Sequence, residues 1–205
     1  MNVERLVLGQ LDTNCWLVSD EAGGPLIVID PAAEEEKLRR AIAGREVAAI
    51  VLTHAHADHL GALHALREAG VPLLVHAADA LAVTDAERNL ATFLGTEAPV
   101  DPPDRVLEDD DIVEAGELAL HVIHTPGHTP GGICLFAEDH LFAGDTLFAG
   151  SVGRSDLPGG DGRVLASSIA EKLAPLPDDT RVHPGHGPDT TIGRERRINP
   201  FFPRA

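Results

Sequence analysis

Thr53-His54-Ala55-His56-Ala57-Asp58-His59 is the most informative stretch of this chain of 205 residues. It directly follows the apolar run 48–52, which predicts a buried strand. A single histidine near a strand end is usually a surface or core residue, but four potential ligands within six residues rarely have a structural explanation. Imidazole and carboxylate groups together suit zinc and its first-row neighbours. The stretch therefore predicts a metal site at the end of this strand.

The backbone of this stretch determines how its side chains can share ions. Residues two apart in an extended segment point to the same side, so His54 and His56 can bind one metal ion. The apolar helical pattern that starts at Leu60 indicates that the chain turns just before it. Asp58 and His59 can then point towards a second ion nearby.

Three later turns add candidate ligands. His128 lies in the Pro- and Gly-rich segment 124–132, Asp145 lies just beyond an apolar strand, and His186 lies in the turn 183–188. All of these side chains come from loops at strand ends. We therefore expect one rim of the fold to carry the whole site.

The hydrophobic pattern predicts a layered fold in a single domain over residues 1–205. Strands are expected over residues 3–8, 14–20, 25–30, 47–53, 72–76, 112–114, 117–124, 131–137, 140–143 and 180–183. Helices are expected over residues 34–43, 60–70, 78–94 and 164–173, with a long connection at 95–111 and a Gly-rich loop at 144–162. This order suggests two packed sheets with helices outside, a four-layer α/β sandwich, although spacing alone does not single out that fold.

Composition narrows the possible partners and the compartment. The formal net charge of −17 disfavours nucleic acid and anionic membranes, because such a surface repels polyanions. The first residues do not form a signal peptide, and no apolar run is long enough to cross a bilayer, so we expect a cytoplasmic protein. Cys15 and Cys134 are expected to pack as small buried hydrophobes rather than to act as nucleophiles.

The motifs together resemble the ligand signature of the metallo-β-lactamase superfamily. The resemblance rests on His54-x-His56-x-Asp58-His59, Gly127-His128-Thr129, Gly144-Asp145 and Gly185-His186-Gly187, in that order along nearly the whole chain. It implies an αβ/βα sandwich with two divalent metal ions, zinc being expected and iron or manganese being possible. It also implies the following ligands: His54, His56 and His128 for the first ion, Asp58, His59 and His186 for the second, and Asp145 between the two.

Within that superfamily the chain looks most like short bacterial hydrolases of the glyoxalase II type. The stretches that carry this likeness are 144–148, 153–161 and 190–201. The likeness implies hydrolysis of a small-molecule thioester, an S-acyl-thiol conjugate such as lactoylglutathione, by a hydroxide that bridges the ions. Asp58 would orient this hydroxide as well as bind metal. The chain ends at Ala205 without the C-terminal helical region that helps longer members to bind glutathione.

Arg154 is the candidate substrate-binding residue. It lies where longer relatives use a basic residue against a carboxylate of the thiol cofactor, and a guanidinium is well shaped for a carboxylate. An arginine that only holds the Gly-rich loop in place is the equally weighted alternative.

Other functions stay open at this stage. A persulfide dioxygenase would share the fold but hold one iron ion and use molecular oxygen. A β-lactamase is disfavoured because no export signal is present. A metal-binding or sensor module would bind metal without turnover, and fold-level analogy is a weak guide to substrate.

Overall fold

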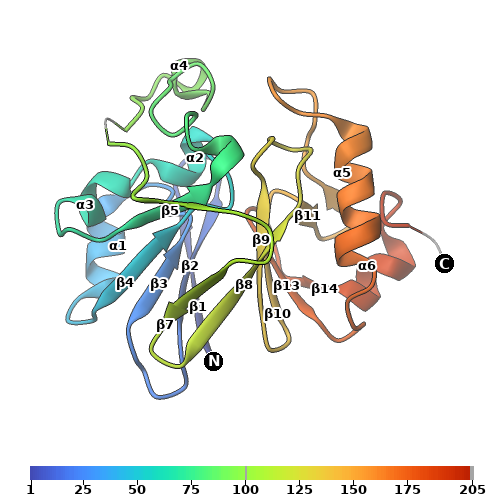
Figure 1. The fold of residues 1–205 in the computed structure, drawn as a ribbon, viewed down its shortest axis with the longest axis horizontal. Coiled ribbons are helices and arrows are strands. Elements are labelled where there is room, and N and C mark those ends of the chain that lie inside the picture. Colours follow the sequence, from blue (N-terminus) through green and yellow to red (C-terminus); the bar gives the residue numbers. More distant parts are fainter. Residues whose placement is uncertain (100, 204–205) are drawn as a thin grey trace.

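Two six-stranded sheets pack against each other and carry helices on their outer faces (Figure 1). The computed structural model describes residues 1–99 and 101–203 of the chain. The first sheet has the order β1 (Asn2–Leu8), β2 (Thr13–Ser19), β3 (Leu26–Ile29), β4 (Val47–Val51), β5 (Leu73–His76) and β6 (Arg105–Leu107). The second has the order β14 (Thr190–Thr191), β13 (Arg181–Pro184), β10 (His140–Gly144), β9 (Ile133–Ala137), β8 (Leu118–His124) and β7 (Ile112–Ala115).

The helices form the two outer layers. Beside the first sheet lie α1 (Glu35–Ile42), α2 (Ala57–Leu60), α3 (Leu63–Arg67) and the short helices η1 (Ala77–Asp79) and α4 (Ala91–Leu94). Beside the second sheet lie α5 (Gly162–Ser168), which continues as a π-helical stretch over Ile169–Leu173, and α6 (Ile192–Ile198). A small hairpin of β11 (Leu147–Phe148) and β12 (Ser151–Val152) follows β10. The predicted four-layer αβ/βα sandwich is confirmed.

Three hydrophobic clusters hold these four layers together. Alternate residues of β3 serve two of them, because side chains in a strand point to opposite faces. Leu26 and Val28 join the cluster beneath the first helical layer, whereas Ile27 and Ile29 join the cluster between the sheets. A third cluster fills the space between the second sheet and α5 and α6. Strands buried on both faces explain why the sequence shows continuous apolar runs rather than alternation.

The prediction of a helix over 78–94 was wrong. Most of this segment consists of turns, with helical structure only at η1 and α4. The Asp85 carboxylate accepts hydrogen bonds from the backbone N–H groups of Glu87 and Arg88, and Asn89 Oδ1 accepts one from the N–H of Ala91. Short polar side chains that bind nearby backbone groups compete with helix formation. Leu90 also has a positive φ of 67°, which ends any helical path before α4.

Other boundaries also differ from the prediction. The expected helix over 60–70 begins at Ala57 and is divided into α2 and α3. The expected connection 95–111, of which residue 100 lies outside the described residues, contains the three-residue edge strand β6. The Gly-rich loop 144–162 contains the hairpin β11–β12. Edge strands and hairpins of two or three residues are too short to show a recognisable periodicity.

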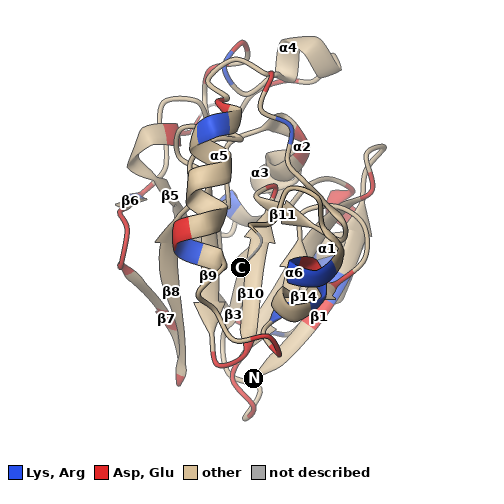
Figure 2. Ribbon diagram, turned by 90° about the vertical axis from the view of Figure 1, so that its right-hand side faces the viewer, with Lys and Arg blue, Asp and Glu red and all other residues tan. Residues whose placement is uncertain are grey.

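Most Lys, Arg, Asp and Glu residues lie outside the strands of the two sheets. Figure 2 shows them mainly on loops and helices, while most strands of the two sheets carry few charges. In residues 1–99 and 101–203, no helix has the length and hydrophobicity that a bilayer crossing requires. Both cysteines are buried and free, and burial raises the pKa of the Cys134 thiol to about 11, so they pack as predicted.

One buried carboxylate links the two sheets at the rim that carries the predicted ligands. Asp79 is 2% exposed and accepts hydrogen bonds from the Ala55 N–H at 3.1 Å, the Thr129 hydroxyl at 2.8 Å and the Gly131 N–H at 2.7 Å. Ala55 lies between two predicted ligands of the first sheet, and Thr129 follows one of the second. Asp79 therefore fixes the two loops relative to each other.

We expect Asp79→Asn to lower the free energy of unfolding by about 2 kcal/mol, because an amide NH₂ would replace an acceptor oxygen and leave a buried donor unpaired. Urea unfolding of the metal-free protein measures this change. The exposed residue Asp179 supplies the control, and Asp179→Asn should stay within about 0.5 kcal/mol of the parent. Equal stability of the two variants would show that Asp79 does not hold the loops.

Candidate metal centre

The seven predicted ligands meet at one rim of the sandwich. From the first sheet, the loop after β4 brings His54 and His56, and the helix α2 that follows brings Asp58 and His59. From the second sheet, the loops after β8, β10 and β13 bring His128, Asp145 and His186. These residues form three overlapping groups in which the potential ligand atoms all lie within 4.8 Å of one another. The site thus lies where the ends of the two sheets approach each other, as the sequence predicted.

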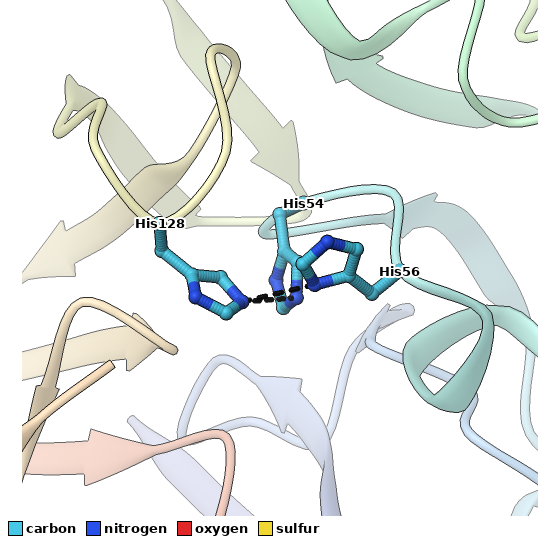
Figure 3. A group of neighbouring side chains, drawn as sticks. All are labelled: His54, His56 and His128. Carbon is cyan, nitrogen blue, oxygen red and sulfur yellow. Dashed lines mark hydrogen bonds between the residues drawn. The ribbon is translucent and has the colours of Figure 1, made fainter. Parts of the chain in front are cut away.

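The first group consists of three buried imidazoles (Figure 3). His128 Nε2 lies 3.0 Å from His56 Nδ1 and 3.2 Å from His54 Nε2. The rings come from two loops and converge on one small region, as the dashed lines in Figure 3 indicate. Three nitrogen donors at these separations match the first predicted metal position.

The second group consists of Asp58, His59 and His186. His186 Nε2 lies 3.3 Å from both Asp58 Oδ2 and His59 Nε2. Gly185, just before this histidine, leaves room for the group, since a Cβ atom there would meet the Asp145 carboxylate and the His59 ring.

Asp145 lies between the two groups. Its Oδ1 is 3.4 Å from His59 Nε2, and its Oδ2 is 3.6 Å from the Nε2 atoms of both His128 and His186. Oδ1 is buried and has no hydrogen-bond partner among the described residues. A carboxylate in this place could contact ions in both groups, and a bridging role for Asp145 stays a prediction.

Four of the histidine rings are held by acceptors at Nδ1, so each turns Nε2 towards the site. The acceptors are the Thr53 hydroxyl for His54 (3.1 Å), the Asp30 carboxylate for His59 (3.0 Å), the Arg154 carbonyl for His128 (2.6 Å) and the Leu11 carbonyl for His186 (2.9 Å). A neutral ring that donates from Nδ1 has a lone pair on Nε2. Lone pairs that face each other at 3.2 Å, as in the first group, repel unless a cation lies between them. The donor set therefore fits divalent metal ions.

The pKa shifts of the histidines in the two groups also fit bound metal ions. Burial lowers the pKa of His54 and takes that of His56 down to about 3, with the neighbouring rings adding to the effect. Burial also opposes a charge on His59, but the three surrounding carboxylates raise its pKa to about 10. The second group thus favours a positive charge so strongly that His59 carries an additional proton when no metal is bound. A metal ion would displace this proton.

Asp30 is a residue of this site that the sequence analysis did not single out. Its carboxylate is 1% exposed, and besides His59 it binds the Thr53 backbone N–H at 2.8 Å and the Thr53 hydroxyl at 2.7 Å. The only sequence signal was an acidic residue directly after the apolar strand β3. Its partners lie more than twenty residues away along the chain, so spacing could not assign them.

The remaining histidines lie outside the three groups. His76 and His124 stack on each other with ring centroids 3.9 Å apart, and His140 Nδ1 lies 2.8 Å from His183 Nε2. The His183 ring also lies 4.7 Å from the ring of Trp16. These contacts belong to the packing of the sandwich.

A pocket of about 540 Å³ opens over the cluster. Asp58, His128, Asp145 and His186 line it together with Arg154, so the predicted substrate-binding residue lies at the site. The Arg154 guanidinium is held in the structure by Asp156, through bonds of 2.8 and 2.9 Å to the two carboxylate oxygens.

Comparison with known proteins places this architecture in a family. The sequence profile of the Metallo-beta-lactamase superfamily matches residues 8–186. The probable metallo-hydrolase YqgX of Bacillus subtilis is 38% identical over 98% of each chain. Hydroxyacylglutathione hydrolase GloC of Haemophilus influenzae is 36% identical, again over 98% of each chain.

Solved structures show the same relationship. BLEG-1 B3 metallo-β-lactamase superimposes with a TM-score of 0.91 at 36% identity, covering 98% of this chain and 99% of its own. TTHA1623 in a di-iron-bound form gives 0.87 at 42% identity, with coverage of 98% and 100%. ETHE1 from Myxococcus xanthus gives 0.79 at 29% identity, with coverage of 98% and 84%. The chain belongs to the metallo-β-lactamase superfamily and has the fold and the general enzyme type of its metallo-hydrolases.

Proposed function

We propose that the protein hydrolyses a small-molecule thioester of the glyoxalase II type, an S-acyl-thiol conjugate such as lactoylglutathione. The main support is the pair of complete ligand groups with Asp145 between them, beneath a pocket that can admit a small molecule. The similarity to GloC over nearly the whole chain favours this branch of the superfamily. The net charge of −17 argues against a polyanionic substrate.

In this proposal the two groups each hold one divalent ion: His54, His56 and His128 the first, Asp58, His59 and His186 the second, with Asp145 a ligand of both. Ions in these positions would supply an activated water and polarise the substrate carbonyl. Zinc suits the nitrogen and carboxylate donors, and iron is the alternative because the similar TTHA1623 structure is in a di-iron-bound form.

The residues of the chain have separate tasks in this reaction. The Asp58 carboxylate lines the pocket and would orient the attacking water. The four acceptors at Nδ1 keep the histidine rings in place, so that little reorganisation is needed when the substrate binds. In the described part of the chain both cysteines are buried, which leaves the reaction to water rather than to a thiol nucleophile.

A persulfide dioxygenase with one iron ion is the second candidate. The similarity to ETHE1 favours it. The completeness of the second ligand group favours the hydrolase. Oxygen consumption with a persulfide, measured beside thioester hydrolysis with protein of known metal content, separates the two.

The first test of the proposal is metal content. We expect about two first-row metal ions per chain, because seven ligands exceed what one tetrahedral ion can use. Removal of the ions by a chelator should abolish hydrolysis, and their return should restore it. Elemental analysis of the active protein measures the ratio. Full activity with one ion per chain would contradict the two-ion site.

The second test concerns Asp145. Asp145→Ala removes a ligand from both ions at once, so metal loss and loss of turnover should occur together. Mutation of residues that contact a metal only through its ligands already lowers metal affinity or activity tenfold to a hundredfold. We therefore expect Asp145→Ala to lower both by about a hundredfold or more. Asp179→Ala, at an exposed position, is the control. Two ions retained at normal affinity would show that Asp145 does not lie between them.

The third test concerns Arg154, which we propose to bind a carboxylate on the thiol part of the substrate. Arg154→Ala should raise KM for a carboxylate-bearing thioester and lower kcat/KM by roughly tenfold, since a hydrogen bond to a charged group contributes about 1.5–3 kcal/mol. Uncharged thioesters should be nearly unaffected.

Asp156→Ala provides the matched comparison, because the Asp156 carboxylate binds the Arg154 guanidinium in the structure. Its removal should free Arg154 and lower KM for the carboxylate-bearing thioester. If charged and uncharged thioesters lost activity equally in Arg154→Ala, the arginine would be holding its loop rather than the substrate.

A further inference from the structure

The pocket over the ligand groups has two different walls. One belongs to the segment after β10 and combines Arg154 and Ser151 with the apolar residues Phe148, Val152 and Leu157. The other includes Leu11, from the turn between β1 and β2, and Leu90, Phe93 and Leu94 at α4. In Figure 1, α4 stands above the first sheet, on the other side of the rim from α5 and the loop that leads into it. The wall at α4 is made of large apolar side chains.

These apolar side chains are unusually open to solvent. Phe93 is 82% exposed, Leu11 is 52% exposed and Leu94 is 38% exposed. They come from two separate segments of the chain yet line one pocket together with metal-ligand side chains. An apolar cluster rimmed by polar groups commonly marks a ligand-binding surface. Because this apolar cluster lines the same pocket as the metal-ligand side chains, we expect it to contact an apolar part of the substrate.

The apolar wall is attached firmly to the metal site. Asn89 is fully buried, and its backbone carbonyl accepts a hydrogen bond of 2.7 Å from the N–H of Ala57, the first residue of α2. The Asn89 side chain also donates to the Val83 carbonyl at 3.1 Å. Since α2 carries Asp58 and His59, α4 has a fixed position relative to these residues.

The charges around the pocket argue against a strongly anionic substrate. Among the described residues that line it, Arg154 is the one Lys or Arg side chain, and Asp156 binds its guanidinium. Recognition of several carboxylates away from the metal ions would need more Lys or Arg side chains than the pocket offers. Apolar contact is therefore the main source of affinity that the wall at α4 can supply.

We propose that the wall formed by Leu11, Leu90, Phe93 and Leu94 binds the acyl group of the substrate, and that this group is an apolar chain longer than lactoyl. The inference rests on the proposed thioester hydrolysis. Arg154 then takes the thiol end, and the wall at α4 takes the acyl end. Hydrolysis breaks the C–S bond and adds water, giving a carboxylic acid and a free thiol.

The experiment compares acetyl, lactoyl, butanoyl, hexanoyl and octanoyl thioesters of N-acetylcysteine with the metal-loaded protein. We expect kcat/KM to rise up to about fourfold per added methylene as far as hexanoyl, because each fully buried methylene favours binding. Phe93→Ala and Leu11→Ala should flatten this rise. Both side chains are exposed, so these variants should fold normally. Ile198→Ala, at a position on α6 that is 53% exposed, is the control and should keep the full rise.

A second measurement does not depend on turnover. Hexanoate should bind more tightly than acetate by calorimetry, and Phe93→Ala should remove the difference. Hydrolysis that is equal at all acyl lengths, with equal binding of the two acids, overturns the inference and leaves the proposed function standing. Binding of hexanoate without hydrolysis of any thioester supports the apolar site but contradicts the proposed function. If Phe93→Ala changes only the oligomeric state on size exclusion, the wall is a contact between copies and the inference fails.

Discussion

The mutual repulsion of ligand atoms gathered at one rim is the constraint on which the rest of this structure depends. In the first group nitrogen lone pairs face each other at 3.2 Å, and in the second group carboxylates crowd around His59. Without a cation such an arrangement would spread apart, so the surrounding chain must hold it. It does so with two backbone carbonyls, a threonine hydroxyl and the buried Asp30 carboxylate, which fix the position and the tautomer of four of the rings.

Two buried aspartates distribute this support between the sheets. Asp30 joins the end of β3 to Thr53 and His59, and so fixes the ligand loop to its own sheet. Asp79 joins that loop to the loop after β8 and so connects the first sheet to the second. The first ligand group needs this connection, because His128 comes from the opposite half of the sandwich. Support of this kind explains how loops can carry a precise site.

The surroundings of the centre carry the information on substrate. Membership of the superfamily gives the fold and the general enzyme type, but the same ligands serve different substrates on related chains. In this chain the pocket is lined, among the described residues, by a single Lys or Arg side chain, Arg154, which is paired with Asp156, and by exposed apolar residues on the side of α4. Such a wall matches a substrate that is recognised mainly by shape and hydrophobic contact.

The sequence by itself determined the layered α/β class and the seven candidate ligands, since apolar strands and ligand-rich turns are local patterns. It failed at the turns of 78–94, where short polar side chains bind nearby backbone groups, and at the edge strand β6, which is too short to show a periodicity. It also did not predict the division of the helix at α2 and α3. Spacing also could not reveal Asp30, Asp79 or the apolar wall at α4. Their partners lie far away along the chain, and only packing of the two sheets brings them together. The tertiary structure decided these features because hydrogen bonds and burial depend on distance in space rather than on separation in sequence.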